Sequence, residues 1–375
     1  MQQLKIGKFE YGREGSTWFE DRIARATART RQIMDVDVGD FITVISIDGL
    51  PIVLQIEDLA DENADFVAVS PEIYRRTRVE EPVKPVTGIT LGCDPEVFIV
   101  EASSGRVVRP SEFMSYGKGQ LGYDGTLLEF RPNYGTSAEV VAKNLWELIA
   151  AARRMLDKSG WGHDLMLWGA SSFNGYTAGF HLHYGLPSGL LGQRVATKRM
   201  AGLMTYVMDY YVGTLSVIAE GDNDNTRRTA PMIKYGKPGG FHIDNRTFEY
   251  RFPGGSLMRH PRLARGLMAL GAVVTEDLVS RIAECTDGFS NFNVIPDLRG
   301  IADLYPGLPD IHTLYGILCS HNTLNAKARF KRITEDVKSM VGYNGRIDAI
   351  EDFFEIIGPH GENFCNIIDK NWLGG

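Results

Sequence analysis

The chain has 375 residues, of which 43% are hydrophobic and 23% charged, a composition typical of folded globular proteins with room for one large domain and an appendage, or for two domains. Its formal net charge of −7 argues against a nucleic-acid-binding protein with a broadly basic surface, and leaves only a local basic groove open. The apolar runs are too short to span a membrane, and the N-terminal residues lack the apolar segment of a secretory signal. We therefore expect a cytoplasmic protein.

The four cysteines support the same location. Cys93, Cys285, Cys319 and Cys365 lack the paired spacing of a zinc site or of a disulfide framework. We interpret them as reduced thiols of a cytosolic protein, with Cys93 in the core of a strand.

The first 85 or so residues predict a small α/β appendage. Residues 17–34 have helical spacing, and residues 39–58 predict two strands around an Asp-Gly turn. The charged, Pro-rich stretch 79–88 is typical of a connector. We therefore expect one unit over residues 1–85 and a second over residues 86–375, and we find no chemical motif in the first.

From residue 88 onward, short strands are separated by long helices. The expected strands are a hairpin over 89–108 with a Ser-Ser-Gly turn, and single strands over 125–133, 178–186 and 245–255. The expected helices cover 137–160, 195–220 and 261–284, with a mostly helical segment from 286 to 375. The strands are polar at alternate positions, whereas parallel strands tend to be apolar throughout. We therefore predict an α+β fold with a curved antiparallel sheet and helices on its outer face.

Four of these strands carry two ionisable residues at period two, which places both side chains on one face. The pairs are Asp94 and Glu96, Glu129 and Arg131, His181 and His183, and Glu249 and Arg251. An ordinary solvent-facing side of a sheet would carry Thr, Ser and Lys, but lysine is absent from these pairs. Because four strands share the pattern, we favour convergence on one site over four separate solvated faces.

The first of these strands is interrupted by Pro95, which lies between the two acidic residues. Proline cannot donate a hydrogen bond to a neighbouring strand. We therefore expect this strand at a sheet edge or at a kink.

The residue types in the four pairs indicate a particular chemistry. Clustered carboxylates raise one another's pKa unless a cation neutralises them. Oxygen and imidazole ligands suit Mg²⁺ or Mn²⁺, while arginine suits phosphate or carboxylate oxygens. Together they are the components of phosphoryl transfer from a nucleotide. The sequence has no GxxxxGK[ST] or strand-linked GxGxxG motif, so metals and basic side chains would have to hold the nucleotide.

A loop over residues 220–242 could supply those basic side chains. It contains Arg227, Arg228, Lys234 and Lys237 among glycines and prolines. A solvated loop and a mobile flap that contacts phosphates or a substrate carboxylate both remain open.

The order of these motifs resembles that of the phage-encoded type 2 COOH–NH2 ligase family, within the glutamine synthetase and glutamate–cysteine ligase superfamily. The likeness extends over roughly residues 88–285 and rests on four motifs: DPE (94–96), YDGTLLEFRP (123–132), AGFHLHYG (178–185) and RTFEYRFPGG (246–255). It implies a glutamine synthetase-like catalytic domain that forms an amide or peptide bond with ATP. In such a reaction ATP phosphorylates a carboxylate to an acyl phosphate, and an amine then displaces the phosphate.

The resemblance also implies roles for the acidic residues and the first histidine. Glu96, Glu129 and Glu249 resemble the metal ligands, with Asp94 as a further ligand. His181 resembles the histidine near the metal and the nucleotide, and it would contact both.

The second histidine and the basic residues would act on the phosphates. His183 resembles the histidine near the transferring phosphate, and Arg251 the arginine that neutralises the phosphoryl group. Arg131 would hold a phosphate or a substrate carboxylate. Arg228 and Lys234 of the loop are expected to contact the nucleotide.

The sequence departs from glutamine synthetase in the first motif, which is Asp-Pro-Glu and not Glu-x-Glu. The ammonia-binding and ring-assembly segments of that enzyme are not recognisable either. Glutamine is therefore a poor prediction for the product.

Other functions remain open. The same carboxylate and histidine set could serve a metal-dependent hydrolase or phosphatase. A non-catalytic binding or virion protein could retain the ligase fold, although the complete set of eight ionisable residues argues against decay. Small-molecule or peptide carboxylates and amines are the expected substrates, with no nucleic-acid or membrane partner. A homo-oligomer and a partner amidotransferase are left open.

Overall fold

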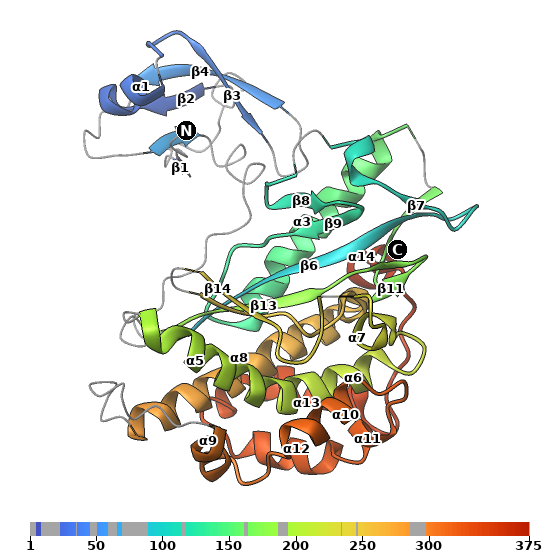
Figure 1. Ribbon diagram of the computed structural model, residues 1–375. Coiled ribbons are helices and arrows are strands. Elements are labelled where there is room, and N and C mark those ends of the chain that lie inside the picture. Colours follow the sequence, from blue (N-terminus) through green and yellow to red (C-terminus); the bar gives the residue numbers. More distant parts are fainter. Residues whose placement is uncertain are drawn as a thin grey trace.

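The computed structural model describes residues 5–8, 23–34, 36–45, 51–58, 66–69, 89–114, 117–160, 164–186, 194–233, 235–244, 247–285 and 298–374. Within these ranges the chain forms a five-stranded sheet, an eight-stranded sheet and a two-stranded ribbon (Figure 1). None of the described helices has the length and apolar character needed to cross a membrane.

The N-terminal residues form the five-stranded sheet and one short helix. In the order β1-β5-β2-β4-β3 its strands are Lys5–Lys8, Phe66–Val69, Ile23–Ala26, Pro51–Asp58 and Phe41–Ile45. Strands β3 and β4 pair antiparallel, which confirms the two strands predicted over residues 39–58. The predicted connector at 79–88 lies outside the described residues, and the division into two units stays a prediction.

The helix expected over residues 17–34 is wrong in part, because residues 23–26 form strand β2. Ala24 is fully buried where β2 lies between β4 and β5, so sheet pairing outweighs the helical spacing of the sequence. Helix α1 (Ala28–Met34) begins only after Thr27, whose hydroxyl accepts a hydrogen bond from the Thr30 amide at 3.1 Å.

The large sheet has the order β14-β15-β13-β6-β9-β8, and β7 and β10 also pair with β6. In chain order its strands are β6 (Thr90–Glu101), β7 (Val107–Val108), β8 (Leu121–Asp124), β9 (Leu127–Phe130), β10 (Leu165–Trp168), β13 (Phe180–Gly185), β14 (Phe241–Asp244) and β15 (Thr247–Tyr250). The ribbon consists of β11 (Ser172–Phe173) and β12 (Tyr176–Thr177). Each described pairing of the large sheet is antiparallel, as predicted.

Of the two positions expected for Pro95, a sheet edge or a kink, the sheet edge is wrong, because β6 lies between β13 and β9. Successive backbone amides of a strand point to opposite sides. The Glu96 amide donates to the Gly179 carbonyl on the β13 side at 2.9 Å, so the missing donor of Pro95 falls on the β9 side. The ladder with β9 begins only at Glu96, directly after the proline.

Helices account for most of the described residues outside the strands. They are α3 (Ala138–Lys158), α5 (Arg194–Met208), the π-helical turn η4 (Asp209–Gly213), α6 (Thr214–Glu220), α7 (Thr226–Thr229), α8 (Pro261–Cys285), α9 (Leu298–Leu304), α10 (Ile311–Leu318), α11 (Leu324–Lys327), α12 (Phe330–Lys338), α13 (Ile347–Ile357) and α14 (Ile368–Leu373). In the part of the chain that the structure describes, there are also the 3-10 turns η2 (Pro110–Glu112), η5 (Gly255–Arg259) and η7 (Asn344–Arg346). The predicted long helices are confirmed, with a π-helical turn inside the second.

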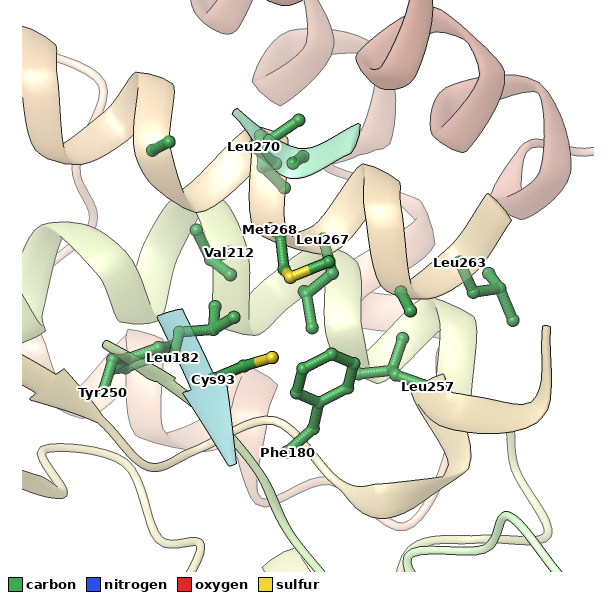
Figure 2. Close-up of a cluster of buried hydrophobic side chains, with 14 of the residues drawn as sticks. Cys93, Phe180, Leu182, Val212, Tyr250, Leu257, Leu263, Leu267, Met268 and Leu270 are labelled. Atoms are coloured by element: carbon green, nitrogen blue, oxygen red, sulfur yellow. The ribbon is translucent and has the colours of Figure 1, made fainter. Parts of the chain in front are cut away.

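The apolar faces of the central strands pack onto helix α8. Figure 2 shows Cys93 of β6, Phe180 and Leu182 of β13 and Tyr250 of β15 near leucines of that helix, such as Leu267. The core position predicted for Cys93 is thus confirmed, and the described cysteines Cys93, Cys319 and Cys365 are free. Because side chains alternate along a strand, this packing turns the ionisable residues of the same strands to the opposite face.

Candidate functional site

The strand register places the four ionisable pairs on adjacent strands. His181 of β13 lies opposite Asp94 of β6, and His183 lies opposite Glu249 of β15. On the other side of β6, Glu96 lies opposite Glu129 of β9. The sheet order β15-β13-β6-β9 therefore brings the four pairs together on one face.

These strands border a cavity of about 350 Å³, which is large enough for a small-molecule ligand. Five carboxylates and two arginines dominate its lining. The lining residues are Asp94, Glu96, Asp124, Leu127, Glu129, Thr177, His181, Arg227, Tyr235, Glu249 and Arg251. A cavity with more carboxylates than arginines suits cations, and anionic ligands that bind as complexes with a cation.

Asp94, His183 and Glu249 form a group that could hold a metal ion. One ligand atom from each lies within 4.8 Å of the others. Asp94 Oδ1 and His183 Nε2 are 3.0 Å apart, yet both atoms are buried without an aligned hydrogen-bond partner among the described residues. Buried polar atoms left without partners are costly, and a bound cation would satisfy both. Two carboxylates and one imidazole therefore fit Mg²⁺ or Mn²⁺.

His181 stands beside this group. Its Nδ1 lies 3.3 Å from Asp94 Oδ1 and 3.4 Å from Glu249 Oε1. The two imidazoles affect the acid between them: burial raises the pKa of Asp94, but His181 and His183 lower it by more, so the net pKa is well below its usual range. Burial lowers the pKa of His183 while Asp94 raises it, and the net pKa is raised.

Arg251, the residue directly after strand β15, binds the carboxylate of Glu249 in that strand. Its Nε lies 2.6 Å from Glu249 Oε1, and its Nη2 lies 2.9 Å from Oε2, which is a bidentate pair. This hydrogen bonding raises the pKa of Arg251 above its ordinary value. The ring of Tyr235 has its centroid 5.9 Å from the Arg251 Cζ, on the same side of the cavity.

Glu96, Glu129 and Asp124 form the other acidic part of the lining. One Glu96 carboxylate oxygen accepts the Gly179 amide at 2.7 Å. Burial raises the pKa of Glu96, and it raises that of Glu129 to about 7, where Asp94, Glu96 and Asp124 add to the rise and Arg131 opposes it. These carboxylates repel one another, so a cation would stabilise their charged forms.

Arg131 lies behind Glu129 and is not among the residues that line the cavity. It pairs with Glu129 and donates to the carbonyls of Gly117 and Gly119, both at 3.0 Å. Glycine is required at 122 for this arrangement, because a Cβ there would lie 2.2 Å from the Arg131 Nη1. The structure thus places Arg131 where it orients Glu129.

The loop residues predicted to contact the nucleotide have different positions. Arg228 is 2% exposed, lies 3.4 Å from Glu220, and donates to the Asp224 carbonyl at 3.1 Å, away from the cavity lining. Lys234 lies outside the described residues. The interpretation of residues 220–242 as a solvated loop is wrong for Arg227 and Arg228. Both belong to helix α7, and both side chains are buried.

The cavity also contains Tyr235 and Asp124, which the sequence did not single out, and Arg227, which the sequence named only as one of several basic residues in the loop. Asp124 stood in the quoted motif around Glu129, and it could have been chosen from that motif. Arg227 and Arg228 are adjacent on one helical turn and therefore point about 100° apart. Nothing in the sequence shows which of the two faces the site.

The family described as "Phage phiEco32-like COOH.NH2 ligase-type 2" matches residues 91–287, which include all four ionisable pairs. The sequence matches no curated protein.

Several solved structures are similar to the chain at low scores. Apo GmaS without ligand has a TM-score of 0.36 at 15% identity, over 71% of this chain and 67% of its own. A bifunctional glutathione synthetase from Pasteurella multocida has a TM-score of 0.33 at 10% identity, over 72% of this chain and 52% of its own, so the match spans about half of that protein. A novel glutamine synthase homolog has a TM-score of 0.42 at 12% identity, over 85% and 78%.

Proposed function

The chain belongs to the phage phiEco32-like COOH.NH2 ligase-type 2 family, and on this premise we propose that it joins a carboxylate to an amine with consumption of ATP. The observation that carries this proposal is the group Asp94, His183 and Glu249. Two of its members, Asp94 and Glu249, line the cavity together with Arg251. A cation site next to a fixed guanidinium is suited to binding nucleotide phosphates.

Each side chain has a role in this proposal. Asp94, His183 and Glu249 would hold Mg²⁺ or Mn²⁺, which when bound would neutralise charge on the phosphate oxygens of the nucleotide. Arg251 would stabilise negative charge on the transferring phosphoryl group, with Glu249 fixing the orientation of its guanidinium. His181, which contacts both Asp94 and Glu249, would keep their carboxylates in place.

In the proposed reaction, ATP is needed to activate the substrate carboxylate by phosphorylation. A carboxylate resists attack by an amine because oxide is a poor leaving group. Transfer of the γ-phosphoryl group to the carboxylate oxygen gives an acyl phosphate and ADP. The amine nitrogen then attacks the acyl carbon, the C–O bond to phosphate breaks, and the amine loses a proton to give the amide.

The acidic part of the lining would serve cations as well. Glu96 and Glu129 lie opposite each other, and each has a raised pKa, so both favour a bound positive charge. A second divalent ion or the ammonium group of the amine substrate would meet this requirement. We further propose a phage-encoded enzyme that acts in the host cytoplasm, where ATP and Mg²⁺ are available.

The test uses the purified full chain with ATP, Mg²⁺ and pools of amino acids, small amines and peptides. We expect ADP and phosphate only when a carboxylate and an amine are both present, with a product lighter than its two substrates by one water in mass spectrometry. Release of phosphate without an amine would favour the hydrolase alternative and overturn the ligase proposal.

A further inference from the structure

Arg227 occupies a buried position at the wall of the cavity. Its side chain is 3% exposed although it lines the cavity, and its own amide donates to Ser172 Oγ at 3.0 Å. Its guanidinium donates from Nη2 to the Arg251 carbonyl at 2.9 Å and from Nη1 to the Phe252 carbonyl. One side chain therefore holds two consecutive carbonyls directly after strand β15.

Two glycines make room for this guanidinium. At Gly236, where φ is +72°, a Cβ would lie 2.2 Å from the Arg227 Nη1. At Gly179 a Cβ would lie 2.8 Å from Nη2. The Gly179 amide also holds Glu96, at 2.7 Å. Gly179 therefore serves two cavity residues: it leaves room for the guanidinium of Arg227, and its amide holds the carboxylate of Glu96.

We propose that Arg227 is a positioning residue of the site: it fixes the backbone of Arg251, so that the side chain of Arg251 holds Glu249 beside Asp94 and His183. The assignment of these residues to a reaction rests on the proposed ligase function. Lysine could retain the charge of Arg227 but could not span both carbonyls, because it lacks the planar fork of arginine. The geometry of Arg227, beyond its charge, is therefore the property to test.

The test compares Arg227→Lys with Arg153→Lys in the full chain. Arg153 is a matched control, since it donates to the Leu165 carbonyl at 2.6 Å and to Asp369 at 3.0 Å, away from the cavity. Mn²⁺ affinity is measured by calorimetry without nucleotide, and melting temperature and ADP release are measured alongside. Ser172→Ala is a milder variant that loosens only the amide of Arg227, and it keeps the test valid if Arg227→Lys fails to fold.

We expect Arg227→Lys to weaken Mn²⁺ binding and to lower kcat by about tenfold each, as is typical when a residue that orients a metal ligand is changed. Ser172→Ala should weaken Mn²⁺ binding by about twofold to threefold, a fraction of that effect. Arg153→Lys should lower the melting temperature and leave Mn²⁺ affinity unchanged.

Three results would overturn the inference: unchanged Mn²⁺ affinity in Arg227→Lys, an equal loss in Arg153→Lys, or no Mn²⁺ binding by the wild type. A wild type that binds Mn²⁺ but releases no ADP with any substrate pool would refute the ligase function alone. The ratio of Mn²⁺ affinities would then still decide the role of Arg227.

Discussion

Arg251 is charged and partly exposed, so its substitution should affect catalysis much more than the stability of the fold. It lines the cavity with its side chain 28% exposed, and its main contact is the carboxylate of Glu249. We expect Arg251→Ala to lower kcat for ADP release by about 100-fold or more, because a fixed charge at the phosphoryl group is lost. The melting temperature should change by only a few degrees, since no core side chain is removed.

Glu249→Gln tests the other half of the same pair. The amide retains the shape of the side chain but loses the charge that pairs with Arg251 and could bind a metal. We expect Mn²⁺ affinity, measured by calorimetry, to fall by about tenfold or more, and activity to fall with it. Full activity in both Glu249→Gln and Arg251→Ala would show that the site is assigned to the wrong residues.

At the residue scale, the sequence predicted those positions that share a face of a strand. The period-two spacing of His181 and His183 was sufficient, because strand geometry turns alternate side chains the same way. The spacing did not predict that Arg131 would turn toward the Gly117 and Gly119 carbonyls, since those contacts come from another part of the chain. The choice between Arg227 and Arg228 depends in the same way on tertiary packing.

At the scale of elements, the π-helical turn η4 connects the helical layer to the loop beside the site. Its residue Asp209 accepts the Tyr250 hydroxyl at 2.8 Å and the Gly239 amide at 2.7 Å. Burial raises the pKa of Asp209 from 3.8 to about 7, against the opposing effect of these two hydrogen bonds. Because the folded pKa lies above the unfolded value, the stabilisation is complete below about pH 4 and is lost as the pH rises through about 7.

Asp209→Asn should remove this pH dependence. The asparagine amide can donate to Tyr250 while its oxygen accepts from Gly239, so it imitates the protonated acid. Between pH 5 and pH 8 the wild type should lose about 3 kcal/mol of unfolding free energy relative to the variant. Urea denaturation at both pH values measures this difference, and a constant difference across the range would contradict the assigned pKa.

Elements were predicted well where local pattern and packing agree. Helix α3 begins after Ser137, whose side chain accepts the Val140 amide, and the predicted range of 137–160 agrees with it closely. Strand β2 was missed because its helical spacing is local, whereas its pairing with β4 and β5 involves residues about 30 and 45 positions away. The prediction of a sheet edge at Pro95 failed for a related reason. The internal strand β6 can contain a proline at this position because its pairing with β9 begins only at Glu96.

At the scale of the whole molecule, the C-terminal helices support the site from outside the matched family region. The Tyr315 hydroxyl donates to the Pro238 carbonyl at 3.0 Å, and the Thr323 amide donates to Asp222 Oδ1 at 2.6 Å. Phe353 and Leu314 belong to the same core cluster as the strands of the large sheet. A chain that ends at residue 287 should therefore fail to fold, although the family match ends there.

Removal of the N-terminal residues should have the opposite result. Among the described residues, the buried cluster of the five-stranded sheet, which includes Leu54 and Ile56, shares no residue with the core cluster of the large sheet. No described residue before Asp94 lines the cavity. A variant that begins at residue 86 should melt within a few degrees of the full chain and retain kcat for ADP release within about threefold, as expected for a unit with its own hydrophobic core. Differential scanning calorimetry and the ADP assay test this. If the shortened chain melts far lower or loses activity, the first 85 residues are an integral part of the catalytic unit, and the predicted division into two units is wrong.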